Sequence, residues 1–264
     1  MRALLASTAL GALALAGCAT ASMTDDAMTA DAGPMMMSAD DIMAPDYVQA
    51  AVASPDRPAT DVARDATRHP DKVLALSGVK PGDHVVEFAG FGQYYTRMLS
   101  DIVGPSGSVD VYDLPYTDRF AGDPSRAFAA AHDNVTYHQG DYNEAALPQN
   151  ADVVFNVLYY HDLEFNGIDV PALNAKIYAA LKPGGRFLVI DHKAEDGSGR
   201  RDAQTIHRID VDVIRQEATA AGFELEVDSD LLAHPEDDRT LMVFDENIRG
   251  LTDRALFVFK KPEM

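Results

Sequence analysis

From residue 84 onward, the chain alternates between short apolar runs and longer segments whose apolar positions recur with helical spacing. Each apolar run predicts a strand, and each periodic segment predicts a helix. The expected strands are His84–Phe88, Ser108–Asp113, Val135–Gln139, Ala151–Tyr160, Arg186–Asp191, Phe223–Leu232 and Leu256–Lys260. The expected helices are Tyr94–Val103, Pro124–His132, Pro171–Leu181 and Val211–Ala221, preceded by a helical pattern over Ala59–Ala75 that Pro70 interrupts. This alternation predicts an α/β fold with a doubly wound, mostly parallel sheet.

The first residues have the pattern of an export signal. Arg2 is followed by an apolar run, Ala3–Ala16, that is too short to span a bilayer but suits the core of a signal peptide. The run ends in Leu15-Ala16-Gly17-Cys18, which resembles the lipobox of bacterial lipoproteins. That resemblance implies a signal peptide over residues 1–17 and a periplasmic protein whose only membrane contact is a lipid on Cys18. Ala19-Thr20-Ala21 leaves an ordinary secretory cleavage site as the alternative.

Between this signal and the expected domain lies a segment with little periodicity. Residues 18–45 are rich in Ala, Met, Thr and Asp and predict a flexible tether, which includes Met35-Met36-Met37. We expect the ordered domain over residues 46–264. Because Cys18 is the only cysteine, this domain contains no disulfide and must be stabilised by burial of apolar surface.

The charge of the chain restricts its partners. The sequence has 42 acidic residues against 22 Lys and Arg, for a net charge of −20 at pH 7. A body this acidic repels phosphate backbones, so nucleic acid is excluded as the expected substrate or partner. The sequence does not indicate an oligomeric state.

Acidic residues and glycines follow three successive strands of the expected sheet. Glu87 precedes a loop that contains Gly90 and Gly92, Asp113 ends the second strand, and Asp141 follows the third. Ligands of doubly wound sheets bind beyond the carboxyl ends of the strands, and an acidic side chain there accepts hydrogen bonds from the ribose hydroxyls of a nucleoside. Asp113 and Asp141 are equally suited to capping turns, but the three positions together favour a nucleoside ligand.

Several motifs in this order resemble class I S-adenosylmethionine-dependent methyltransferases. They are Val85-Val86-Glu87-Phe88, Gly140-Asp141, Ala151-Asp152-Val153-Val154-Phe155-Asn156 and Leu181-Lys182-Pro183-Gly184-Gly185. Further runs resemble a bacterial family of predicted, often exported methyltransferases: Arg64, Tyr94-Tyr95-Thr96-Arg97, His207-Arg208-Ile209-Asp210 and Lys261-Pro262.

The resemblance implies a Rossmann-like, seven-stranded sheet with an antiparallel last strand and S-adenosylmethionine as the methyl donor. It also implies that Glu87, Gly90 and Gly92 face the methionine moiety, Asp113 the ribose and Asp141 the adenine.

The glycine loop departs from the pattern of that family. Ala89, Phe91 and Gln93 stand where the family has glycines, so that Gly90 and Gly92 are one position out of register. A Phe or Gln side chain at these positions can crowd the donor. The donor is also made in the cytoplasm, so an exported enzyme has no obvious supply of it. Two functions therefore remain open: a methyltransferase for a small-molecule acceptor, or a non-catalytic periplasmic binding or structural protein on a degenerate methyltransferase scaffold.

Two histidines and two aspartates follow the fourth and fifth strands, which adjoin in the implied fold. His161-Asp162 and Asp191-His192 should converge beside the transferred methyl group. We expect His161 to remove the acceptor's proton, with Asp162 orienting it and His192 beside it. A purely structural loop histidine and a site for zinc, iron or manganese remain alternatives. His207-Arg208 is expected either at the substrate edge or as solvated loop charge.

Overall fold

A computed structural model describes residues 35–37 and 41–263, all within the unit Gly33–Met264. The expected signal peptide, Cys18 and most of the expected tether lie outside the described residues. Within the described part, no helix combines the length and the apolar composition needed to cross a bilayer.

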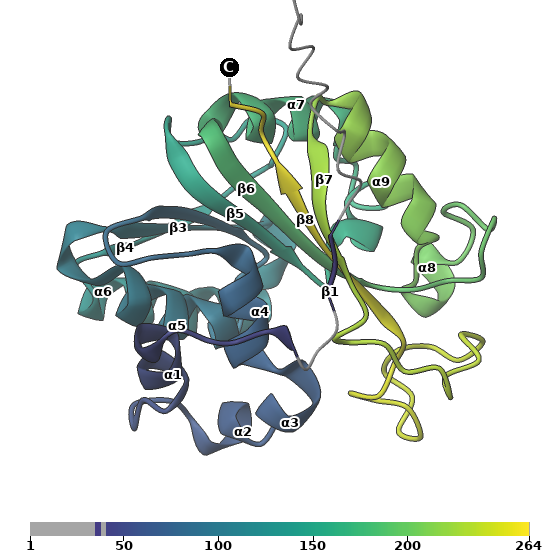
Figure 1. The fold of residues 1–264 in the computed structure, drawn as a ribbon, viewed down its shortest axis with the longest axis horizontal. Coiled ribbons are helices and arrows are strands. Elements are labelled where there is room, and N and C mark those ends of the chain that lie inside the picture. The colour runs from purple at the N-terminus through teal and green to yellow at the C-terminus, as the bar shows by residue number, and fades with distance from the viewer. Residues whose placement is uncertain (1–34, 38–40, 264) are drawn as a thin grey trace, which may run out of the picture. The chain divides into compact units, whose positions relative to one another are not determined.

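The described strands form one sheet in the order β1-β7-β8-β6-β5-β2-β3-β4 (Figure 1). Their bounds are β1 Met35–Met37, β2 His84–Phe88, β3 Ser108–Asp113, β4 Val135–Gln139, β5 Ala151–Val157, β6 Leu181–His192, β7 Glu224–Ser229 and β8 Arg254–Lys260. Neighbouring strands are parallel except where β8 pairs with β6 and β7. The predicted seven strands with an antiparallel last strand are therefore confirmed as β2 to β8.

The eighth strand lies where we expected a tether. Met35–Met37 of β1 pairs in parallel with Val227–Ser229 of β7 at the edge of the sheet. An edge strand needs only one neighbour for its backbone hydrogen bonds, so a short segment outside the expected domain can occupy this position without a periodic sequence pattern.

Helices cover both faces of the sheet, as the doubly wound prediction requires (Figure 1). Their bounds are α1 Asp46–Val52, α2 Ala59–Val62, α3 Asp65–Arg68, α4 Pro70–Ser77, α5 Tyr94–Val103, α6 Asp123–Ala131, α7 Val170–Ala180, α8 Ala203–Ile206 and α9 Val211–Ala220. Met98 of α5 belongs to the apolar core on one face, and Ile214 of α9 belongs to the core on the other. Both side chains are fully buried.

Several predicted elements have other bounds in the structure; for example, the predicted strand Phe223–Leu232 ends at Ser229, and the predicted strand Arg186–Asp191 begins at Leu181. The expected strand Ala151–Tyr160 stops at Val157, because Leu158 adopts a left-handed conformation with a φ of 57° and residues Tyr160–Asp162 form a 3₁₀ turn. In the segment Ala59–Ala75, Pro70 begins α4, where its missing N–H group costs no hydrogen bond. The earlier end of the strand at Val157 directs His161 toward the ligand-binding edge of the sheet.

Candidate active site at the carboxyl ends of the strands

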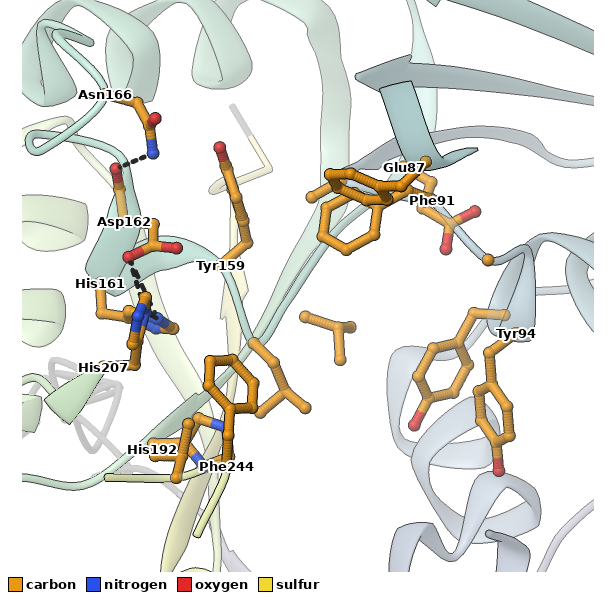
Figure 2. Close-up of a pocket in the computed structure, with 18 of the residues that line it drawn as sticks. Glu87, Phe91, Tyr94, Tyr159, His161, Asp162, Asn166, His192, His207 and Phe244 are labelled. Atoms are coloured by element: carbon orange, nitrogen blue, oxygen red, sulfur yellow. Dashed lines mark hydrogen bonds and ion pairs between the residues drawn. The ribbon is translucent and has the colours of Figure 1, made fainter. Parts of the chain in front are cut away.

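A cavity of about 610 Å³ opens beyond the carboxyl ends of β2, β5 and β6 (Figure 2). Glu87, Gly90, Gly92, His161, Asp162 and His192 line it, and these are six of the eight residues predicted for the site. The other two, Asp113 and Asp141, do not line this cavity. The cavity thus brings together the predicted residues at the ends of β2, β5 and β6, and does not include those at the ends of β3 and β4.

His161 is held by a buried carboxylate. Its Nδ1 lies 2.7 Å from Oδ1 of Asp191, and its backbone N–H donates to Oδ2 of the same residue at 2.7 Å. Asp191 is fully buried and His161 is 3% exposed. Burial lowers the pKa of His161, but the charge of Asp191 and its hydrogen bond outweigh this effect and raise the pKa. The Asp191 carboxylate thus fixes a proton on Nδ1 and leaves Nε2 directed away from it.

Asp162 was predicted as the orienting partner of His161, but the carboxylate that contacts Nδ1 is that of Asp191. Asp162 lies on the opposite side of the ring, with its Oδ1 3.3 Å from Nε2 of His161. His207 joins them: its Nδ1 is 3.1 Å from Oδ1 of Asp162 and 3.3 Å from Nε2 of His161. Figure 2 shows the three side chains converging on one wall of the cavity. We call these residues the His–Asp–His cluster.

His207 was expected only at a substrate edge or in a solvated loop. It follows the short helix α8, and its φ of 57° places it in the left-handed region. His207 does not directly follow a strand, which explains why the pattern of residues at the strand ends could not reveal its place in the His–Asp–His cluster.

His192 lies beside the cluster but is bound elsewhere. Its Nδ1 is 2.8 Å from Oγ1 of Thr252, and its ring centre is 6.1 Å from that of His161. Burial, reinforced by the charge of His161, lowers the pKa of His192 well below its usual range. A neutral His192 forms part of the cavity wall, and we place no proton transfer on it.

Glu87, the next-to-last residue of β2, lies at the far side of the cavity from the His–Asp–His cluster (Figure 2). Its Oε2 accepts a hydrogen bond of 2.6 Å from the hydroxyl of Thr96. Burial raises the pKa of Glu87 to about 8, and the charge of Asp113 acts in the same direction. A Cβ at Gly90 would come within 2.7 Å of Val111 and 3.1 Å of Glu87, so only glycine fits this position without a shift of its neighbours.

The altered glycine loop follows a path that accommodates its larger side chains. Gln93 turns away from the cavity, where its Nε2 donates to the hydroxyl of Ser125 at 2.8 Å. Phe91 remains in the cavity wall, packed edge-on against Phe120 and Tyr159. Phe91 and Gln93 were the two side chains expected to crowd the donor, and of these only Phe91 borders the cavity.

Asp113 provides a buried acceptor at the end of β3. Both of its carboxylate oxygens are buried, and the hydroxyl of Tyr137 and the N–H groups of Phe91 and Gly90 face them without forming hydrogen bonds of ordinary geometry. Burial raises its pKa to about 6. A buried carboxylate whose hydrogen bonds are poorly formed is costly and can accept two ribose hydroxyls, so Asp113 fits the donor chemically. Because the loop covers it, this fit requires the segment around Gly90 and Phe91 to move.

Asp141 has the turn-capping role that competed with its predicted role at the adenine. Its side chain is exposed, and its Oδ1 accepts a hydrogen bond from the backbone N–H of Asn143 at 2.9 Å.

The mouth of the cavity is rich in aromatic side chains and arginines. Phe120, Phe165 and Phe244 are each more than half exposed there, at 53%, 54% and 58%. Arg68 and Arg119 also line the cavity and form no ion pair with a described residue. The cavity therefore offers apolar planar surface together with positive charge in a strongly acidic protein.

The chain is similar to known methyltransferases. A family model described as an O-methyltransferase domain matches residues 95–224. The chain is 25% identical over 193 residues to the ubiquinone/menaquinone biosynthesis C-methyltransferase UbiE of Saccharophagus degradans, covering 71% of this chain and 72% of that protein. It is 33% identical over 125 residues to the protein of the same name from Ectopseudomonas mendocina, covering 45% of each chain.

Solved structures share the fold. An S-adenosylmethionine-dependent methyltransferase from Aquifex aeolicus superposes with a TM-score of 0.55 at 18% identity, covering 82% of this chain and 99% of that one. A protein described as a sarcosine dimethylglycine methyltransferase from Galdieria sulphuraria gives a TM-score of 0.53 at 17% identity, covering 84% and 92%. The sheet order and these likenesses establish the Rossmann-like methyltransferase fold.

Proposed function

We propose that this chain, a class I methyltransferase with S-adenosylmethionine as its methyl donor, methylates a hydroxyl or amine group of a small molecule. When bound, the donor supplies a methyl group that passes from its sulfonium sulfur to the acceptor, which loses a proton. The observation that carries the proposal is the position of His161. Its Nδ1 is fixed by Asp191, and the ring lines the cavity that Glu87 and the glycine loop also border.

The cavity supports a small acceptor with a planar, apolar body. Its volume of about 610 Å³ lies within the usual range for small-molecule sites. The exposed rings of Phe120, Phe165 and Phe244 surround its mouth. The relatives named for ubiquinone and menaquinone biosynthesis are consistent with a ring-shaped acceptor, and the O-methyltransferase model favours a hydroxyl as the methylated group.

The His–Asp–His cluster activates the acceptor in this proposal. Methyl transfer needs alignment of the donor and acceptor and removal of the acceptor's proton. We place the acceptor's hydroxyl at this cluster, where His161 is the central group. Glu87 faces the donor on the other side of the cavity, and Asp113, which does not line the cavity, reaches the donor once the segment around Gly90 and Phe91 has moved.

The test uses S-adenosylmethionine with an isotopically labelled methyl group and a small-molecule extract of a bacterial host as the source of acceptors. Mass spectrometry detects labelled products and S-adenosylhomocysteine. We expect transfer by the wild-type protein and by the control His84→Ala, whose side chain is exposed at the opposite end of β2. His161→Ala should lower turnover by roughly a hundredfold while leaving donor affinity unchanged.

Two results would count against this proposal. Unchanged turnover in His161→Ala would remove this residue from the mechanism. If the wild-type protein binds the donor but labels no compound in the extract, the non-catalytic binding protein on a methyltransferase scaffold becomes the better account.

A further inference from the structure

We propose that the His–Asp–His cluster binds one divalent transition-metal cation, with zinc or ferrous iron as the fitting ions. The ligand atoms are Nε2 of His161, Oδ1 of Asp162 and Nδ1 of His207. They come from two segments far apart in the sequence and meet on the cavity wall (Figure 2).

The distances within the cluster are longer than those of the other histidine–carboxylate pairs among the described residues. The three ligand atoms lie 3.1, 3.3 and 3.3 Å from one another. By contrast, His161 lies 2.7 Å from Asp191, and His138 lies 2.7 Å from Asp110. Charge-assisted hydrogen bonds have lengths of about 2.7–2.9 Å. The contacts within the cluster are therefore longer than these two histidine–carboxylate contacts, although two of them are still hydrogen bonds, and the three are nearly equal.

The same distances fit three ligands of one ion. A tetrahedral zinc ion with bonds of about 2.0–2.1 Å holds its ligand atoms about 3.3 Å apart, and the same bonds at right angles hold them about 2.9 Å apart. The observed range of 3.1–3.3 Å lies between these values. An ion at ordinary bond lengths can thus contact all three atoms without a rearrangement of the side chains.

Asp191 fixes the tautomer of His161 that a metal ligand requires. Histidine ligands usually donate their second ring N–H to a carboxylate, which fixes the tautomer and directs the other nitrogen toward the metal. Nδ1 of His161 makes this contact with Asp191 at 2.7 Å, so that the lone pair lies on Nε2. Asp162 and Asp191 also place two carboxylates, 15% and 0% exposed, around the site. A dication would balance their charge.

The ligand set determines the class of ion. Two imidazoles and one carboxylate suit zinc and ferrous iron, whereas magnesium prefers an all-oxygen environment. His207 is held in a left-handed conformation that non-glycine residues rarely adopt, with its ring 5.1 Å from that of Phe244. Strain of this kind concentrates at functional sites. Three protein ligands leave coordination positions free on the cavity side.

This inference rests on the proposed function for its purpose and deepens it. An acceptor hydroxyl at the free coordination position would have a lowered pKa and would release its proton to solvent before it receives the methyl group. His161 would then activate the acceptor as a metal ligand, and its Nε2 would not take up the proton.

The experiment measures binding of the metal alone. Purified protein is stripped with a chelator, incubated with Zn²⁺, Mg²⁺ or, without oxygen, Fe²⁺, and passed through a desalting column before the metal-to-protein ratio is determined by mass spectrometry. We expect one zinc or iron ion per chain and no magnesium. Calorimetry should show at least tenfold weaker zinc binding in His207→Ala, and a loss of 10- to 100-fold in Asp191→Asn. The control His84→Ala should bind zinc like the wild type.

His207 is a suitable position because a quarter of its side chain is exposed (25%), so its removal should leave the fold intact. A zinc ratio well below one in the wild-type protein, or undiminished affinity in a folded His207→Ala, would overturn the inference. Full methyl transfer by stripped protein in the presence of chelator would also overturn it and would leave the proposed function standing. Zinc binding with no methyl transfer would support the site and count against the function.

Discussion

The buried carboxyl group of Glu87 gives a prediction about stability. Glu87 is 4% exposed, and burial raises its pKa from 4.5 to about 8. Below pH 4.5 the group is protonated in both the folded and unfolded states. Between pH 4.5 and 8 the folded state holds a proton that the unfolded state has released, so the free energy of unfolding falls as the pH rises. Glu87→Gln removes this titration and keeps an oxygen that can accept the Thr96 hydrogen bond.

The magnitude follows from the size of the shift. Each unit of pKa corresponds to about 1.4 kcal/mol, so the variant should gain about 1.4 kcal/mol over the wild type for each pH unit between pH 5 and 8. The full shift sets an upper limit of about 5 kcal/mol at pH 8. This limit is a large part of the stability of a typical domain.

Urea denaturation at pH 5, 6, 7 and 8 measures the effect as the difference between the variant and the wild-type protein, in which all other titrations cancel. Glu236→Gln, at an exposed position, is the matched control and should show no such trend. A difference between Glu87→Gln and wild type that stays constant across this range would refute the reasoning, because it would mean that Glu87 is ionised in the folded state.

Three further predictions concern the donor and the N-terminus. Asp113→Asn should raise the free energy of unfolding at pH 8 by up to about 3 kcal/mol, because the raised pKa of about 6 makes the ionised form costly above that pH. In calorimetry the same variant should bind S-adenosylhomocysteine at least tenfold more weakly. Higher stability with unchanged binding would exclude Asp113 from the donor site. Asp141→Ala should change this affinity less than twofold because its carboxylate is exposed, whereas a tenfold loss would restore its predicted contact with adenine. In a Gram-negative host, wild-type protein should fractionate with membranes and Cys18→Ala should not, and soluble periplasmic protein in both cases would refute the lipid anchor.

The sequence predicts the sheet well because each strand is encoded locally. Apolar runs such as Val85–Phe88 are bounded by polar or glycine-rich segments, and the alternation with helices determines that the strands are parallel. The sequence does not predict the edge strand β1, because its pairing with β7 uses backbone hydrogen bonds and requires no periodic pattern of apolar residues.

The site is predicted less completely because its geometry depends on rotations and loop paths. A strand-end pattern locates His161 and Asp191 at the ends of neighbouring strands, but it does not contain the left-handed turn at Leu158 or show that Asp191 and not Asp162 contacts Nδ1 of His161. The contribution of His207 depends on a loop beyond β6 and is invisible in local sequence. The turn away from the cavity at Gln93 is equally a property of the folded loop.

Donor binding is the central requirement of this account, and calorimetric titration of the purified wild-type protein with S-adenosylhomocysteine tests it most directly. We predict micromolar affinity, which corresponds to about −8 kcal/mol, carried by the buried carboxylate of Asp113 once the covering segment around Gly90 and Phe91 has moved. Absence of heat at millimolar ligand, in protein shown to be folded by circular dichroism, would contradict the account.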